Sequence, residues 1–126
     1  MRNEGEVDVF TTIDDSPGVK LYNPGDIESP VRITVTRYNG GVEWKDFEIK
    51  LNGETRLKIS PKSFEDGWTL RIDSYTKLIT DDKGNICNSY ITEGDFFDIP
   101  LGESWLEYTL DNTPFSISVK YDYWYI

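Results

Sequence analysis

The chain of 126 residues contains no histidine and only one cysteine. Without histidine the usual general base, the Ser-His and Cys-His nucleophile pairs and most zinc sites are excluded. The single cysteine, Cys87, excludes an intramolecular disulfide, and in its strand-like stretch we expect it to be a small buried apolar side chain. No glycine-rich phosphate loop is present. We therefore expect no cofactor and no bound metal.

Positive charge and long apolar runs are also scarce. Lysine and arginine total 13 against 23 acidic residues, a formal net charge of −10. Such a surface repels a phosphate backbone, so nucleic acid is not an expected partner. No apolar run approaches a transmembrane span, and residues 1–20 lack the apolar core of a secretory signal, so no membrane association is expected. The hydrophobic share of 37% supports one folded domain over residues 1–126.

Apolar and polar residues alternate along most of the chain with the period of two that half-buried strands require. No segment keeps a helical period for more than one turn, so no long helix is expected. Strands with one apolar face each bury those faces by stacking two sheets. The sequence therefore predicts an all-β fold, a two-layer antiparallel β-sandwich or jelly roll. The inward positions are expected to be Val7, Val9, Ile13, Val31, Ile33, Val35, Phe47, Ile49, Leu51, Leu57, Ile59, Trp68, Leu70, Ile72, Leu106, Tyr108, Leu110, Phe115, Ile117, Val119 and Tyr121.

Turn motifs separate these runs. Asn52-Gly53 predicts a tight hairpin because both residues tolerate a positive φ, and Asn39-Gly40-Gly41 predicts another hairpin just before it. Residues 81–85 and 111–114 mark two more reversals, the second expected to join the last two strands as a hairpin. Residues 81–85 also gather oxygen ligands, but they lack the spacing and distal Glu of a calcium loop. A polar turn is the favoured interpretation.

Strand parity directs Trp68 inward and Trp44, Trp105 and Trp124 outward. Large rings left in water mark a surface for a partner or ligand, although a register slip of one residue would return them to the core. If the parity holds, Trp105 and Trp124 share one face of the final hairpin, with Tyr38 or Trp44 nearby. Trp44, Trp105 and Trp124 are therefore the candidate binding residues.

An enzyme without histidine would have to use two facing carboxylates, as glycosidases do. Glu43, Glu48 and Glu107 lie on predicted strands and are the candidates. Glu48, however, shares the solvent parity of Asp46 and Lys50, and chance placement explains these positions in so acidic a chain. We expect no catalytic residue.

Short motifs follow one another in a fixed order from residue 20 to the end of the chain. They are an Asn-x-Gly turn before a Pro-led strand, a strand ending in Ile-Asp, a strand with a Gly-containing turn, a Phe-led stretch with apolar-Pro and Gly, and an aromatic final strand. Their residues are Asn23–Asp26 with Ser29–Ile33, Gly67–Ser74, Lys77–Ile79 with Asp82–Asn85, Phe96–Glu103, and Val119–Tyr125.

In order and spacing these motifs resemble the C-terminal domain of the siphophage distal tail proteins. Two departures stand out: Leu101 separates Pro100 from Gly102, where the family usually has Pro directly before Gly, and Ser104 replaces a common Asn. The family's N-terminal ring-forming domain has no counterpart in these residues.

The resemblance implies a structural protein of a phage or prophage tail tip, part of the virion and assembled in the cytoplasm of the bacterial host. In that family the C-terminal domain is a galectin-like sandwich that projects from a hexameric hub and holds receptor-binding or other baseplate proteins, or touches the host surface. It implies no catalytic residues. Without the ring-forming domain, and with a charge of −10 opposing self-association, we expect the isolated domain to be a monomer or at most a weak dimer.

Two other function classes stay open. A carbohydrate-binding module would stack the sugar rings of a host-surface glycan on Trp44, Trp105 or Trp124, with nearby acids accepting hydroxyl hydrogen bonds. A carboxylate glycosidase is the third class. Tryptophans beside a groove would favour sugar binding, whereas a flat or convex patch would favour a protein partner.

Overall fold

The computed structural model describes residues 2–12, 18–37, 46–60, 69–110 and 115–125. In this part of the chain, strands dominate and the only helical segment is a 3-10 turn, Asn88–Tyr90. The described residues contain no helix that is long and apolar enough to cross a membrane. The strands are β1 (Arg2–Thr12), β2 (Gly18–Asn23), β3 (Ser29–Arg37), β4 (Phe47–Leu51), β5 (Glu54–Ile59), β6 (Thr69–Asp73), β7 (Leu78–Asp81), β8 (Ile91–Gly94), β9 (Asp98–Ile99), β10 (Gly102–Leu110) and β11 (Phe115–Tyr125).

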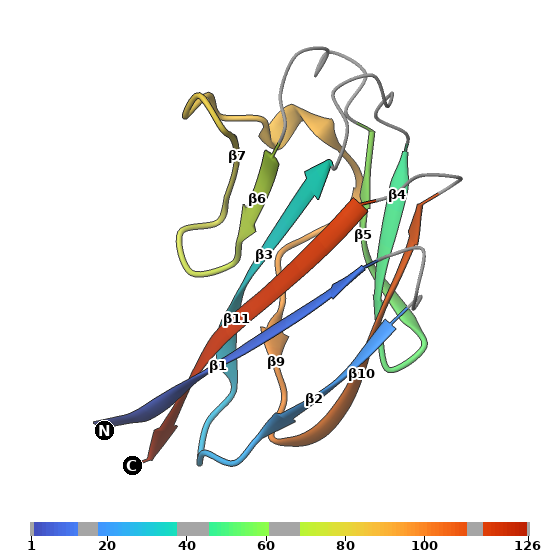
Figure 1. Cartoon of the computed structure of the whole chain (residues 1–126). Coiled ribbons are helices and arrows are strands. Elements are labelled where there is room, and N and C mark those ends of the chain that lie inside the picture. Colours follow the sequence, from blue (N-terminus) through green and yellow to red (C-terminus); the bar gives the residue numbers. More distant parts are fainter. Residues whose placement is uncertain (1, 13–17, 38–45, 61–68, 111–114, 126) are drawn as a thin grey trace.

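The strands form two packed antiparallel sheets, which confirms the predicted two-layer β-sandwich (Figure 1). The six-stranded sheet has the order β1-β11-β3-β6-β7, with the short β9 paired to the start of β3. The five-stranded sheet has the order β2-β10-β4-β5-β8. The two chain ends lie side by side because β1 pairs along β11, from Arg2 opposite Tyr125 to Thr12 opposite Ser116.

The core lies between the sheets, and it is built from the alternating apolar positions. Strands such as β4, β6 and β7 turn every second side chain toward the other layer, so their buried positions follow the period of two. Cys87 is buried in the same cluster, as predicted. The other buried core residues are Leu21, Val31, Ile33, Val35, Phe47, Ile49, Leu51, Leu57, Ile59, Leu70, Ile72, Ile79, Phe97, Ile99, Leu106, Tyr108, Ile117, Val119 and Tyr121.

The Asn52-Gly53 hairpin is confirmed. It joins β4 to β5, and both of its residues have positive φ, 53° and 81°. The other two predicted hairpins are wrong, because β3 and β11 belong to the six-stranded sheet whereas β4 and β10 belong to the five-stranded sheet. Their connections cross from one layer to the other. A turn motif reverses the chain but does not specify whether the next strand pairs beside the last one or in the opposite sheet.

This topology separates two candidate residues. Trp105 lies on β10 and Trp124 on β11, so the two rings belong to different sheets and do not share the hairpin face predicted for them. The turn residues 39–41 and 111–114 lie outside the described residues. So do Tyr38, Trp44 and Trp68.

Tyr121 ties the two sheets together. Its ring is fully buried on β11, and its hydroxyl donates to the Tyr22 carbonyl at 2.8 Å and accepts from the Tyr22 amide at 2.9 Å. Tyr22 lies on β2, an edge strand of the other sheet. One phenol therefore satisfies both backbone groups of a residue that is distant in sequence, and burial raises the pKa of that phenol.

The Asn23-Pro24-Gly25-Asp26 turn is held against the end of β11. The buried Asn23 side chain donates to the carbonyls of Ile27 and Ile99, and its own oxygen accepts from the Gly25 amide. A Cβ on Gly25 would lie 2.6 Å from the Trp124 carbonyl oxygen, so the position requires glycine. The Asp26 amide donates to that same carbonyl at 2.7 Å. The turn thereby positions Trp124.

The 81–85 segment is a polar turn, as favoured. The Asp81 carboxylate accepts from the backbone amides of Lys83 and Asn85 and from the Asn85 side chain, each at 2.9 Å. Burial acts to raise the pKa of Asp81, but these hydrogen bonds outweigh it and lower the pKa below its ordinary value. Within the described residues, no group of three or more acidic or cysteine side chains is placed to hold a metal ion.

Candidate binding surfaces

A shallow hollow of about 220 Å³ lies on the outward face of the six-stranded sheet. Register brings its charged side chains together, because Lys120 on β11 is opposite Arg32 on β3, which is in turn opposite Asp73 on β6. Arg71 and Thr34 form the next cross-strand pair on the same face. The hollow is lined by Arg32, Ile33, Thr34, Arg71, Ile72, Asp73, Ser118 and Lys120.

A second hollow of about 200 Å³ adjoins the first, since Arg32 and Asp73 line both. It differs from the first by containing two aromatic side chains, Tyr75 and Trp124. Its lining is completed by Ser29, Pro30 and Asp122, so the full set is Ser29, Pro30, Arg32, Asp73, Tyr75, Asp122 and Trp124. We refer to the two hollows together as the β3 groove.

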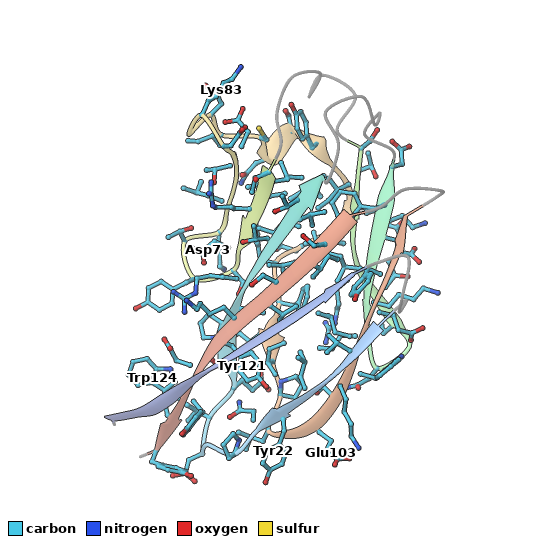
Figure 2. The ribbon with its side chains drawn as sticks, in the orientation of Figure 1. Tyr22, Asp73, Lys83, Glu103, Tyr121 and Trp124 are labelled. Atoms are coloured by element: carbon cyan, nitrogen blue, oxygen red, sulfur yellow. The ribbon has the colours of Figure 1, made fainter. Side chains whose placement is uncertain are left out.

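Hydrogen bonds and an ion pair fix the backbone and side chains around the aromatic end of the β3 groove. Asp73 accepts hydrogen bonds from the amides of Tyr75 and Thr76, which shapes the turn after β6 and carries Tyr75, 70% exposed, beside the groove. Trp124 is half-buried, and Figure 2 shows it and Asp73 on the same side of the molecule. The Asp122 carboxylate lies 3.8 Å from the Arg32 guanidinium. The Ser29 hydroxyl at the start of β3 donates a hydrogen bond to the Asp122 carbonyl on β11.

A different surface carries Trp105. On the outward face of the five-stranded sheet, Trp105 is paired with Lys20, and the next pair is Glu103 with Tyr22. Tyr22, Leu101 and Trp105 are 58%, 49% and 43% exposed. We call these three residues the β2–β10 patch. A salt bridge of 3.2 Å between Lys20 and Glu103 lies among them, and Figure 2 shows Tyr22 and Glu103 together at this edge of the sandwich.

Trp105 also has a structural role. A Cβ on Gly18 would lie 2.8 Å from the Trp105 indole, so the ring lies against the backbone of that edge-strand glycine. Aromatic side chains cover glycines on neighbouring strands in this way. The buried part of the Trp105 ring therefore has a structural role, because it covers Gly18. The exposed part of the ring is the surface that a partner can contact.

The three tryptophans predicted to be binding residues therefore differ in where the structure places them. Trp105 lies exposed on one sheet, Trp124 lies half-buried beside a groove on the other, and Trp44 is outside the described residues. Their binding role stays a prediction. Sequence reasoning missed Tyr75 and the polar residues that surround Trp124. The solvent parity of Arg32 and Asp122 was readable in the sequence, but their proximity to Tyr75 depends on pairing between distant strands.

Two of the candidate carboxylates, Glu48 and Glu107, lie on the outward face of the five-stranded sheet. Glu48 is 3.5 Å from the Lys50 ammonium and 3.7 Å from that of Lys58, and it accepts from the Thr55 hydroxyl. The hydrogen bond that Lys58 donates to the Glu93 carboxylate, together with the negative charges of Glu93 and Glu48, raises the pKa of Lys58. Glu107 is opposite Lys50 in the register. Glu48 therefore belongs to a charge network on a strand surface, and Glu43 lies outside the described residues.

Comparisons with known proteins place the fold. No family model and no curated protein sequence matches the chain. Among solved structures, it is similar to the Dit protein (gp 19.1) of phage SPP1, which is presented as a paradigm of the hub adsorption apparatus in phages that infect Gram-positive bacteria. The TM-score is 0.67 at 16% identity. The chain has the fold of part of a phage hub protein.

The alignment covers 92% of this chain and 46% of the Dit protein, so the chain spans less than half of its length. A second structure, a β-glucosidase from Paenibacillus barengoltzii, aligns with a TM-score of 0.45 at 9% identity, over 93% of this chain and 10% of the enzyme. A likeness that low carries no argument for glycosidase activity. The Dit likeness agrees in fold with the distal tail protein resemblance of the sequence.

Proposed function

We propose that this domain is a non-enzymatic structural adaptor of a phage or prophage tail tip. The observation that supports it is the fold likeness to the SPP1 Dit protein over 92% of the chain. The order of sequence motifs supports the same family independently. In this proposal residues 1–126 are one domain of the virion, assembled in the bacterial host cytoplasm, and its galectin-like sandwich holds a baseplate or receptor-binding protein or meets the host surface.

The β2–β10 patch is the surface that we propose for the protein partner. Tyrosine and tryptophan are the side chains most enriched among residues that dominate interface energies, and a polar rim around an apolar centre is the usual anatomy. The Lys20–Glu103 pair supplies polar contacts among the exposed rings. Tyr22 is also preorganised, because the Tyr121 hydroxyl holds its backbone on both sides. Less conformational freedom is then lost on binding.

Electron microscopy of virions tests the location. Phage particles from the strain that carries this gene are labelled with gold-conjugated antibodies raised against the purified domain. We expect gold at the tail end distal to the capsid. Particles that carry no label, although the protein is present in the lysate, would refute the adaptor function.

Capture of tail proteins tests the patch. Tyr22→Ala in the full-length gene product is expected to weaken capture of its tail-tip partner by about tenfold or more, the usual effect of truncating a central aromatic. The matched control is Tyr75→Ala, which removes an exposed tyrosine from the other sheet. Equal capture by both variants and the unchanged protein would remove the β2–β10 patch from the interface.

A further inference from the structure

We infer that the β3 groove is a binding site for a neutral saccharide, with one sugar ring packed on Trp124 and Tyr75. This goes beyond the adaptor function and does not depend on it, because the groove and the β2–β10 patch lie on different sheets. The shape of the groove, the chemistry of its lining, its rigidity and its charge each favour such a ligand.

The dimensions suit a short oligosaccharide. Sites for drug-sized ligands usually have volumes of roughly 300–1,000 Å³. Each hollow is smaller, at about 220 and 200 Å³, but the two adjoin through Arg32 and Asp73. Side by side they offer room for a ligand built from consecutive small units, which run across β11, β3 and β6.

The lining combines apolar faces with donors and acceptors. A sugar presents an apolar C–H face and a ring of hydroxyls, and each hydroxyl both donates and accepts. Trp124 and Tyr75 supply aromatic surface at one end. Asp73 and Asp122 supply acceptors, and Arg32 supplies donors between them. Arg71, Thr34 and Ser118 continue the polar lining into the first hollow, the one without aromatic side chains.

The aromatic end is preorganised, which favours ligand binding over a merely polar surface. The Asp26 amide donates to the Trp124 carbonyl, and the absence of a Cβ at Gly25 allows the turn to lie against the backbone of Trp124. Asp73 shapes the turn that carries Tyr75. A rigid site loses less side-chain and loop entropy when it binds.

The charge of the whole chain favours a neutral ligand over an anionic polymer, because the lining itself is close to balanced. The described lining contains Arg32, Arg71 and Lys120 against Asp73 and Asp122, and Arg32 is already paired with Asp122. In the register of β1 and β11, Lys120 is opposite Asp8. The chain as a whole has a charge of −10. The field of such a protein repels polyanions at a distance.

The test is a screen of the purified 126-residue chain on an array of neutral oligosaccharides of two to six sugars. The array contains glucose, galactose, rhamnose and N-acetylglucosamine. Binders are then titrated by NMR, which follows the Trp124 indole N–H, assigned by its loss in Trp124→Phe. We expect at least one binder that shifts this resonance. Tyr75→Ala should weaken that binder by about tenfold, and Tyr22→Ala, the matched exposed tyrosine on the other sheet, should leave its affinity unchanged.

Three outcomes would overturn the inference. They are no binding of any arrayed sugar at millimolar concentration, binding that Tyr75→Ala leaves intact, and selective binding of a glycerol phosphate polymer included as the anionic comparison. Circular dichroism of each variant confirms that the sandwich is folded. Loss of sugar binding with normal incorporation into virions would separate this site from the adaptor function.

Discussion

At the scale of the residue, polar side chains tie backbone segments that are far apart in sequence. Ser74 both accepts from the Val31 amide and donates to the Val31 carbonyl, and Tyr121 does the same for Tyr22 in the opposite sheet. A buried group that loses such a partner bears its full desolvation cost. The hydrogen bonds of these two residues therefore stabilise the sandwich in addition to its apolar core.

Tyr121→Phe tests the tie between the sheets. The substitution keeps the ring and removes both hydrogen bonds to Tyr22, so the free energy of unfolding should fall by about 1–3 kcal/mol in urea denaturation. The control is Tyr22→Phe, which removes a hydroxyl from an exposed ring and should change the unfolding free energy by less than about 0.5 kcal/mol. Equal small effects would show that the Tyr121 hydroxyl contributes nothing.

The phenols of Tyr121 and Tyr90 make the stability of the domain depend on pH in the alkaline range. Burial raises the pKa of Tyr121, and burial together with Cys87 raises the pKa of Tyr90 from its ordinary value of about 10 to about 12. The unfolded chain then loses these protons at lower pH than the folded one. The contribution of these phenols to the free energy of unfolding is fully present below pH 10, and it declines as the pH rises toward 12. Tyr90→Phe should flatten that decline in melting curves, whereas an unchanged slope would contradict it.

At the scale of the element, close approaches between turns and strands position the surfaces. The Asn23–Asp26 turn contacts the backbone of β11, and the turn after β6 brings Tyr75 beside it. Gly94, with φ of 90°, similarly lets β8 approach the Arg56 backbone on β5. The glycine in the Asn-x-Gly motif has a steric reason of this kind, which connects that motif to the placement of Trp124.

Gly25→Ala tests this close approach. The new methyl group would meet the Trp124 carbonyl at 2.6 Å, so the turn must move and the free energy of unfolding should fall by about 1–3 kcal/mol, as in other overpacked sites. The Trp124 indole resonance should shift in NMR spectra. Gly84→Ala is the comparison, because that glycine has open space around it and only its positive φ is strained. A smaller loss for Gly25→Ala than for Gly84→Ala would refute the steric role.

At the scale of the whole molecule, the two sheets present different chemistry on their outward faces. The six-stranded sheet carries the β3 groove, and the five-stranded sheet carries the β2–β10 patch and the Glu48 charge network. The surface proposed for a protein partner and the groove proposed for a saccharide therefore lie on different layers. This separation allows each proposal to be tested without disturbing the other.

The isolated domain is expected to be a monomer, or at most a weak dimer, in dilute solution. Its charge of −10 opposes self-association, and the ring contacts of the distal tail family belong to a domain that these residues do not resemble. Multi-angle light scattering at physiological salt should give a mass close to 14.6 kDa. A stable hexamer would mean that the sandwich itself carries ring contacts.

The sequence by itself determined strands such as β3, β4 and β6, the inward faces of these strands and the tight turn at Asn52-Gly53. These follow from local chemistry, since side chains alternate along a strand and only certain residues accept a positive φ. Val31, Ile33 and Val35 are buried as the alternation requires. Only the tertiary structure decided that β10 and β11 lie in different sheets, and that Arg32, Tyr75 and Trp124 meet in one groove. Pairing between distant strands depends on how whole faces pack, which no short stretch of sequence encodes.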